Sequence, residues 1–470
     1  MAYKDNREYI AALEKTGDLV HIKQEVDWDV EMGAIIRRGC ELRAPAILFE
    51  SIKDYPGWKI LASPAATYRR FAICLGLDAN ATVKDIYKVY GERMEKPVPP
   101  VIVKEGPCKE NVFLGDKVDL FNLPCPLAHD GDGGRYIGLW AFEVTKALTS
   151  DWLNWGIYRV MVYDRQTLAG QFLPSKHIGI HLAQYTAQKK PMPIAIVVGP
   201  DPVSGMVAQF PVGPGQNEVD YAGGLRQAPV ELVKCETSDL LVPAHAEIIV
   251  EGEVLPDKFI PEGPYGEYTG YRSGLKTQNI IKVKAITHRN NPIFTVSNMG
   301  IPPHEGDHAA IARGWEYETF LRNQGIPVTN AFVHPEFAIM AVVVGVKVTH
   351  ANMANRVKNA ILATHPAGVH KIFVVDEGVD VFNLNEVLHA FGTKCNPLHG
   401  IKATEEYITG LVPWLTPQER RLGKGGVVVF DCTWPVDYPK DAIPPKMAFS
   451  TYPEEIQKKV LDNWTKYGFK

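Results

Sequence analysis

The 470-residue sequence lacks the features that mark several large classes of protein. Its longest apolar runs, such as residues 339–344, fall well short of the ~18 residues that a membrane-spanning helix needs. The first eight residues are charged and lead into no long apolar stretch, so we expect no secretory signal peptide. The 50 basic and 54 acidic residues are mixed along the chain and leave a net charge of -4. We therefore expect no nucleic-acid partner and no membrane partner.

Cysteine is also sparse. The seven cysteines are scattered, odd in number and form no C-x-x-C pair, so neither a disulfide framework nor a zinc site is expected. Two glycine-rich segments, 131–135 and 423–426, match neither the phosphate-loop nor the dinucleotide-binding fingerprint, and we interpret both as turns or loops. No turn of the kind that presents a nucleophilic serine or cysteine is recognisable. These absences favour a soluble, cytoplasmic protein with reduced thiols.

The composition that is present is that of an ordinary globular protein, with 46% hydrophobic and 22% charged residues. The length allows two to four domains. Apolar periodicity predicts helices near residues 3–16 and 31–42, followed by a strand at 46–49. Together these elements indicate an N-terminal α/β domain over residues 1–105, which ends in the proline-rich connector 96–100.

A different pattern follows over residues 106–305, where many short β-rich runs are separated by Gly and Pro. They predict a sheet or barrel rather than a doubly wound array, with one helix at 178–188. The expected strands include 157–163, 194–198, 246–250 and 280–286. Residues 306–470 return to alternating helices and strands, which indicates a second α/β domain with a terminal helix at 453–466 that could dock on a neighbouring subunit. Its other expected elements are helices 307–324, 351–363 and 384–391 and strands 339–348 and 371–376.

Two glutamates flank a Gly/Pro turn in the segment Pro261-Glu262-Gly263-Pro264-Tyr265-Gly266-Glu267. The turn allows both carboxylates to point into one cavity. Paired carboxylates in unequal environments split their pKa values, and one can stay protonated as a general acid. Such a group is worth about 10²–10⁴ in rate. A surface turn with two solvated glutamates is the simpler alternative, and the motif by itself favours it.

Two further segments carry residues that could bind anions or metals. Arg159 follows residues 154–158 into an expected strand, and an inward-facing arginine there needs a carboxylate partner. Lys176 and His177 precede the expected helix, where free backbone N–H groups could hold a phosphate and His177 could bind a metal. A solvated edge-strand arginine and a structural histidine are the alternatives.

Taken together, five segments resemble the UbiD-like decarboxylases in the same order along the chain, with the ferulic (cinnamic) acid decarboxylases closest. The segments are Asn154-Trp155-x-Ile157-x-Arg159, Lys176-His177-Ile178, Glu218-x-x-Tyr221-x-Gly223-Gly224, Val233-Lys234-Cys235-Glu236-Thr237 and Glu262-Gly263-Pro264-x-Gly266-Glu267. The likeness is strongest from about residue 105 to 300 and weakest over the first hundred residues.

The resemblance implies an α/β (α+β) subunit of three parts: an N-terminal α/β domain, a central split β-barrel that binds flavin, and a C-terminal α/β dimerisation domain with a terminal helix. It also implies prenylated FMN supplied by a separate prenyl-flavin synthase, a divalent metal (Mn²⁺ or Mg²⁺) at the cofactor phosphate, and K⁺. The family's metal-ligand positions fall on Asn154, His177 and Glu218, and its potassium site on the backbone carbonyls of Trp155 and Ala208. A homodimer or homohexamer is expected.

The same resemblance gives roles to the charged residues. It implies that Arg159, oriented by Glu262, holds the substrate carboxylate, and that Glu267 supplies a proton after CO2 leaves. The reaction implied is a reversible, non-oxidative decarboxylation in which the cofactor carries the difficult chemistry. The positions expected to contact the flavin are Asn154, Gly156, Ile157, Tyr158, Arg159, Lys176, His177 and Glu218.

Several positions depart from the cinnamate enzymes and narrow the expected substrate. Tyr158 and Tyr268 stand where those enzymes have Ala and Met, which favours a small aromatic or heteroaromatic acid of the hydroxybenzoate, furoate or pyrrole type. Lys176 replaces a Gln, while Pro366 stands where a phosphate-binding Lys is usual, so one charge could substitute for the other. Residues that could line the substrate end are His304, His308 and Arg313.

Three alternatives stay open. The substrate could be a cinnamate or another acrylic acid rather than an aryl acid. The chain could instead be a non-catalytic, flavin-binding subunit of a multisubunit carboxylase, although the intact Arg159, Glu262 and Glu267 argue against this. A flavin reductase would consume NAD(P)H, and the absence of a dinucleotide motif disfavours it.

Overall fold

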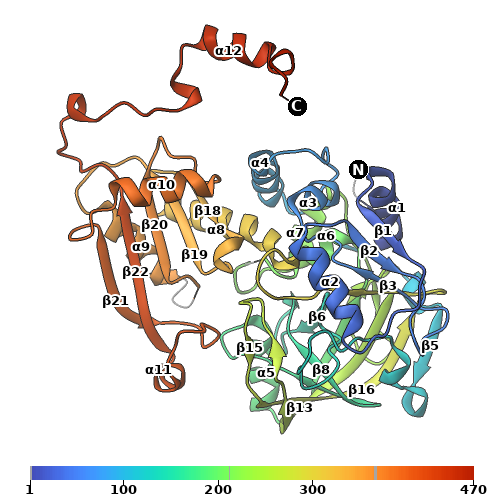
Figure 1. The fold of residues 1–470 in the computed structure, drawn as a ribbon. Helices are drawn as coiled ribbons and strands as arrows, with labels where there is room; N and C mark the ends of the chain where they lie inside the picture. The colour runs from blue at the N-terminus through green and yellow to red at the C-terminus, as the bar shows by residue number, and fades with distance from the viewer. Residues whose placement is uncertain (1–2, 211, 365–367, 470) are drawn as a thin grey trace.

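A computed structural model describes residues 3–210, 212–364 and 368–469 as a mixed α/β protein in three parts (Figure 1). The first helix, α1 (Asn6–Thr16), begins where the Asp5 side chain accepts hydrogen bonds from backbone N–H groups of the first turn. It ends at Gly17, whose φ of 74° is the left-handed conformation that glycine adopts without strain. None of the helices in the described residues is both long and apolar enough to cross a membrane.

In the described residues the N-terminal part combines the helices α1 to α4 with a four-stranded sheet of order β1-β2-β3-β17. The predicted helices at 3–16 and 31–42 and the strand at 46–49 are confirmed. The last strand, β17 (Ile293–Val296), comes from far along the chain and joins the N-terminal sheet to the central part. The remaining bounds are β1 (Leu19–Ile22), β2 (Ala46–Phe49), β3 (Lys59–Ala62), α2 (Glu31–Glu41), α3 (Tyr68–Cys74) and α4 (Val83–Met94).

The central part contains an eight-stranded antiparallel sheet whose path runs β7-β6-β10-β13-β16-β9-β8, with β5 paired to β16. In the described residues the end strands β7 and β8 do not pair with each other, so the barrel is not closed. The strands are β5 (Asn111–Leu114), β6 (Ala141–Lys146), β7 (Leu153–Gly156), β8 (Val160–Asp164), β9 (Thr167–Gly170), β10 (Met192–Val198), β13 (Ile248–Glu262) and β16 (Lys276–His288).

The single strand predicted at 157–163 is wrong over its first three residues, because β7 ends at Gly156 and β8 begins at Val160. The backbone N–H of Ile157 donates to the carbonyl of Ala208 (3.3 Å), and that of Tyr158 donates to the buried carboxylate of Glu143 (2.9 Å). The Ala208 carbonyl lies outside the sheet and the Glu143 carboxylate is a side chain of β6, so neither bond continues the backbone ladder and the chain turns out of it.

Smaller elements complete the central part. Helix α5 (His177–Ala187) confirms the helix predicted at 178–188. A two-stranded hairpin, β14 (Tyr265–Gly266) with β15 (Arg272–Ser273), follows the end of β13. The others are α6 (Pro202–Val207), α7 (Glu218–Arg226), and the three-stranded sheet of β4 (Val101–Ile102), β11 (Glu231–Lys234) and β12 (Leu241–Pro243).

The C-terminal part is a five-stranded sheet of order β18-β19-β20-β22-β21, reached through the long helix α8 (Ala309–Asn323). The predicted strands at 339–348 and 371–376 are confirmed as β19 (Ala341–Val346) and β20 (Lys371–Asp376). Pro366 lies outside the described residues. In Figure 1 the terminal helix α12 (Glu454–Asp462) sits at the end of an extended arm, away from the sheet. The remaining elements are β18 (Val328–Val333), β21 (Ile401–Tyr407), β22 (Lys424–Cys432), α9 (Met353–Thr364), α10 (Leu384–Lys394) and α11 (Pro417–Leu422).

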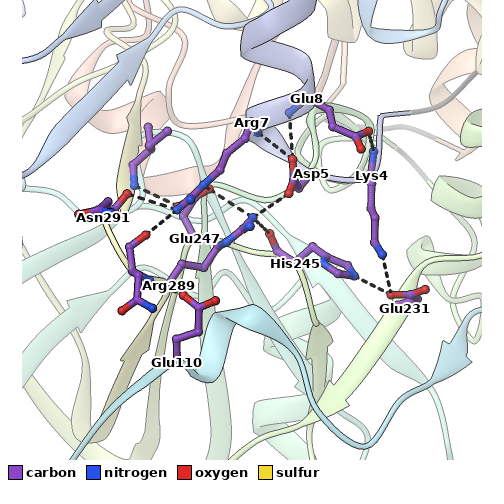
Figure 2. A network of polar contacts seen from close by, with 12 residues as sticks. Lys4, Asp5, Arg7, Glu8, Glu110, Glu231, His245, Glu247, Arg289 and Asn291 are labelled. Atoms are coloured by element: carbon purple, nitrogen blue, oxygen red, sulfur yellow. Dashed lines mark hydrogen bonds and ion pairs between the residues drawn. The ribbon is translucent and has the colours of Figure 1, made fainter.

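A network of polar contacts ties α1 to the central part (Figure 2). The fully buried carboxylate of Glu247 accepts two hydrogen bonds from Arg7, at 2.8 and 2.9 Å. Arg289 lies 2.8 Å from Asp5 and 3.6 Å from Glu247. Because a buried carboxylate needs both a counter-charge and hydrogen bonds, these contacts fix the position of α1 against the central sheet.

Candidate active site

The structure brings Arg159, Glu262 and Glu267 together, although more than a hundred residues separate the arginine from the glutamates. All three side chains are buried. Arg159 Nη2 donates to Glu262 Oε2 at 2.8 Å, while Nη1 donates to Glu267 Oε1 and to the hydroxyl of Ser273 (2.8 Å). The sequence predicted that the arginine needs a carboxylate partner. The structure provides two, one at each terminal nitrogen.

Backbone geometry explains why these residues meet. Arg159 lies in the connection between β7 and β8, Glu262 is the last residue of β13, and Glu267 follows β14. The Gly263–Pro264 turn between the glutamates lies next to the loop at Gly133, whose N–H donates to the Pro264 carbonyl at 2.7 Å. A Cβ at Gly133 would collide with the Gly263 carbonyl, so this close approach requires glycine.

Two tyrosines that the sequence did not single out complete this cluster. The Tyr136 hydroxyl donates to Glu262 Oε1 at 2.6 Å, so this carboxylate is held from both sides. The guanidinium of Arg159 lies 5.4 Å from the centre of the Tyr265 ring, within the range of a cation–π contact. No local pattern around Tyr136 could have revealed it, because its partner is distant in sequence.

Burial affects the proton affinity of two groups in this cluster. Loss of hydration raises the pKa of Glu267, and the opposing effects of Arg159 and of a hydrogen bond with Ser273 do not cancel it. Burial and the hydrogen bond to Glu262 raise the pKa of Tyr136 strongly, so this hydroxyl stays protonated and remains a donor. A carboxyl with a raised pKa, as at Glu267, is suited to holding and releasing a proton.

A second cluster forms where β7 meets α5 and α7, and it contains all three residues predicted to bind a divalent metal. His177 Nδ1 lies 3.2 Å from Glu218 Oε1, and the other oxygen of Glu218 accepts from the Trp155 backbone N–H (2.9 Å). The Asn154 amide donates to the Thr145 hydroxyl at 3.3 Å, which leaves its carbonyl oxygen available.

This donor set fits a hard divalent cation. Two neighbouring ligands of an octahedral ion, each about 2.1 Å from it, lie about 3 Å apart, as the His177 nitrogen and Glu218 oxygen do. An amide oxygen, a carboxylate and one imidazole suit Mn²⁺ or Mg²⁺ better than soft-ligand metals. In the described part of the chain no group of three or more His, Cys, Asp and Glu side chains could hold a metal ion. The predicted set contains two such side chains, His177 and Glu218, together with Asn154.

A short segment connects the two clusters, and the Tyr158 side chain folds back against it. The Tyr158 hydroxyl accepts from the backbone N–H of Ile178 in the first turn of α5, at 3.4 Å. A Cβ on Gly156 would collide with that hydroxyl, so glycine is required for the ring to fold back on β7. The Ala208 carbonyl, predicted to contribute to a potassium site, accepts the N–H of Ile157.

Lys176 and Arg313 lie close enough for their charges to interact. Loss of hydration and, after it, the charge of Arg313 lower the pKa of Lys176, and Glu316 opposes this only in part. Lys176 is nevertheless exposed. Two neighbouring cations repel each other, so this pair favours an anion bound beside it.

The two histidines predicted near the substrate end differ in their surroundings. His304 Nδ1 accepts from the Gly306 N–H (2.9 Å), so Nε2 carries the proton and donates to the Tyr268 carbonyl (3.1 Å). Burial lowers the pKa of His304 to about 4. His308 is fully buried among aromatic rings, and burial lowers its pKa to about 3. His304 thus contacts the residue after Glu267, whereas His308 lies within the core.

A cavity of about 680 Å³ lies elsewhere, between α4, α8 and the C-terminal sheet. Its lining mixes Lys84, Asp380 and other charged residues, and the Lys84–Asp380 ion pair (2.7 Å) connects the N-terminal and C-terminal parts there. None of the residues predicted to bind substrate, flavin or metal lines it, so it belongs to the junction between the parts.

Comparison with known proteins gives a consistent result. The chain matches three domain families described as parts of 3-octaprenyl-4-hydroxybenzoate carboxy-lyase: the N-terminal domain over residues 10–89, the Rift-related domain (UbiD) over 101–302 and the C-terminal domain over 309–432. It is 34% identical over 488 aligned positions to the pyrrole-2-carboxylic acid decarboxylase of Pseudomonas aeruginosa, covering 99% of this chain and 98% of that protein.

Solved structures agree over the whole length. The vanillic acid decarboxylase of Sedimentibacter hydroxybenzoicus in closed form matches with a TM-score of 0.90 at 33% identity, covering 99% of this chain and all of that one. An evolved dimeric form of a UbiD-class enzyme from Pelotomaculum thermopropionicum, in complex with prFMN, matches with a TM-score of 0.81 at 27% identity, covering 94% and 97%. The mixed α/β fold expected from the sequence is confirmed.

Proposed function

The chain belongs to the UbiD family of carboxy-lyases, and from this premise we propose that it decarboxylates a small aromatic or heteroaromatic acid, reversibly and without oxidation, with prenylated FMN. Relatives named for pyrrole-2-carboxylic and vanillic acids support a hydroxybenzoate-, furoate- or pyrrole-type substrate. The solved structure with prFMN supports the cofactor.

The observation that carries the proposal is the buried guanidinium of Arg159 between two glutamates. Its Nη groups are occupied by Glu262, Glu267 and Ser273, but its Nε is buried and has no hydrogen-bond partner in the described residues. An unpaired, buried N–H of a charged group is unfavourable, so a substrate carboxylate would be a good acceptor for it. Glu262, braced by Tyr136, keeps the guanidinium in place for this contact.

Glu267 is proposed to deliver the proton that replaces CO2. Its raised pKa keeps a larger fraction protonated near neutral pH than a solvated glutamate would have. The bound flavin would supply an electron sink for the pair of electrons that CO2 leaves behind. The protein would hold the carboxylate at Arg159 and place the Glu267 proton beside the carbon from which CO2 departs.

The cofactor would extend from the cluster of Arg159, Glu262 and Glu267 to the cluster predicted to bind a divalent metal. Asn154, His177 and Glu218 would hold Mn²⁺ or Mg²⁺ at its phosphate, and the Lys176–Arg313 pair would add positive charge. We assign the contacts to the flavin itself to the segment from Gly156 to Arg159. K⁺ at the carbonyls of Trp155 and Ala208 remains a prediction.

The exposed surface of the terminal arm supports a proposal for how the protein assembles. The terminal arm exposes large apolar side chains, including Met447 (90% exposed) and Leu461 (62%), which favours burial against another subunit in a homodimer or homohexamer. The separate prenyl-flavin synthase and the cytoplasmic location are predictions from the sequence.

A direct test uses protein produced together with a prenyl-flavin synthase. Mass spectrometry identifies the bound flavin, and CO2 release is measured on a panel of aryl, heteroaryl and acrylic acids. We expect the wild type to release CO2 from a small aryl acid, and Arg159→Lys to keep the flavin but lose turnover, because lysine keeps the charge but not the planar fork. Flavin-loaded wild type that releases CO2 from none of these acids would rule the proposal out.

A further inference from the structure

The glycine-rich segment 131–135, predicted to be a turn or loop, belongs to a loop over residues 129–135 that lies directly against the hairpin carrying Glu267. Gly133 donates its N–H to Pro264, and a Cβ on Gly266 would collide with the imidazole of His129. On the other side of the hairpin, Arg272 donates to the carbonyl of Asp130. The loop therefore contacts both strands of the hairpin, β14 and β15.

An ion pair inside this loop contacts the backbone next to Glu267. Asp132 is fully buried, and its Oδ2 lies 3.0 Å from His129 Nδ1. Its Oδ1 accepts the backbone N–H of Gly266 at 2.9 Å, one residue before Glu267. The other ring nitrogen of His129 lies 2.7 Å from the Met299 carbonyl. One carboxylate thus links His129 to the backbone that sets where Glu267 points.

Both nitrogens of His129 face acceptors only, which requires a proton on each and makes the ring a cation. Burial opposes that charge, but the hydrogen bonds to Asp132 and Met299 outweigh it and raise the pKa of His129, although Arg272 acts against them. The charges that face this ring are Asp132 in the same loop and Arg272 on β15. A paired imidazolium satisfies the buried carboxylate, which would otherwise be strongly unfavourable.

The ladder of this hairpin is short. It consists of two residue pairs, Tyr265 with Ser273 and Gly266 with Arg272. The Glu267 N–H donates to Tyr271 within the same hairpin, so this bond does not anchor the hairpin to the rest of the protein. The external anchors are the loop contacts, the bonds from Arg159 to Glu267 and Ser273, and the bond from His304 to Tyr268. Among these, the Asp132 bond acts on the backbone at Gly266, directly before Glu267.

We infer that His129 and Asp132 are positioning residues for the proton donor Glu267, acting through the Gly266 N–H rather than by contact with substrate. This inference rests on the proposed decarboxylation. Loss of the pair lets the hairpin shift, which moves the Glu267 carboxyl away from the reacting carbon without changing its charge or the Arg159 contact that binds substrate.

The test compares His129→Gln, Asp132→Ala and Asp132→Asn in the flavin-loaded, full-length protein. Alanine removes the acceptor for Gly266. Asparagine keeps that acceptor, and its NH2 group can donate to a neutral His129, so it restores the link without charge. His245→Gln is the matched control, because His245 forms a similar pair with Glu231 (2.6 Å) far from the hairpin, in the network of Figure 2.

We expect kcat to fall about 10- to 100-fold in Asp132→Ala and His129→Gln, the scale of a displacement of about 1 Å at a reacting group. KM and flavin content should stay as in the wild type. Asp132→Asn should recover most of the lost rate, and His245→Gln should lose none. Equal kcat in wild type and Asp132→Ala, or a loss confined to flavin content, would overturn the inference.

Crystal structures of the same variants decide the matter independently of activity. Asp132→Ala should displace residues 265–268 relative to Arg159, whereas Asp132→Asn should leave them in place. If the wild type releases CO2 from no acid, the proposed function fails, and an undisplaced hairpin in Asp132→Ala would separately refute the positioning role.

Discussion

Replacing Glu267 by glutamine removes the proposed proton donor while changing little else. Glutamine has nearly the same shape, and its carbonyl oxygen can still accept from Arg159 Nη1 in the buried cluster. Where Glu267 is ionised, the change removes one negative charge, and Glu262 remains as the single carboxylate facing the guanidinium. An anionic substrate should therefore bind as well as before or more tightly, and KM should stay constant or fall.

The expected loss lies in kcat. General-acid catalysis contributes about 10²–10⁴ in rate, which corresponds to about 2.7–5.4 kcal/mol in the activation barrier. In the wild type, burial raises the pKa of Glu267, so the protonated form persists to higher pH than for a solvated glutamate. Because the reaction consumes the protonated form, wild-type kcat should fall as pH rises through that raised pKa. The Glu267→Gln variant should show a low rate that lacks this dependence.

The assay is initial CO2 release per bound flavin, with flavin content measured by absorbance and mass spectrometry for each preparation. Glu236→Gln is a suitable control, because Glu236 is in an ion pair with Lys109 (2.7 Å) and contacts none of the residues assigned to the site. A Glu267→Gln protein with normal flavin content and wild-type kcat would show that the proton comes from elsewhere, and the assignment would be abandoned.

Three further changes test the rest of the site and its support. His177→Ala should lower bound Mn²⁺, measured by elemental analysis, together with flavin retention, because it removes one of the two groups 3.2 Å apart at the metal cluster. Tyr136→Phe should lower kcat/KM about tenfold or more, since it removes the 2.6 Å hydrogen bond that braces the Glu262 carboxylate. Glu247→Gln should lower the free energy of unfolding by about 1–3 kcal/mol, measured by denaturant titration, by weakening the contact with Arg7 while leaving flavin content unchanged.

The sequence predicted those parts of the molecule in which local pattern decides structure. The helices at α1, α2, α5 and α8 and the strands β2, β10, β19 and β20 were predicted near their observed bounds, because periodicity and capping act within a few residues. The edge strands β18 and β21 and the inner strand β22 of the C-terminal sheet were not predicted. β21 is exposed along most of its length, so it carries little apolar alternation to reveal it.

The sequence identified the segments that carry the site residues, but not all of the side chains that contact one another there. Glu262, Glu267 and Arg159 were predicted to cooperate, whereas Tyr136 was missed because a single tyrosine carries no local signal. The segment 131–135, which contains Asp132, was interpreted as a turn or loop, and His129 was not identified. The partners of these two residues, Gly266 and Met299, are more than a hundred residues away. Hydrogen bonds of this range become visible only when the strands are placed in space.

The break between β7 and β8 shows how the fold and the site depend on each other. Asn154 in the metal cluster and Arg159 in the carboxylate cluster are five residues apart, so the chain between them spans at most about 17 Å. If the whole segment were strand, neighbouring side chains would point to opposite faces of the sheet. The N–H bonds of Ile157 to Ala208 and of Tyr158 to Glu143 end the strand instead and redirect the chain before Arg159. The interruption that made the strand prediction wrong is therefore what allows one short segment to carry residues of both clusters.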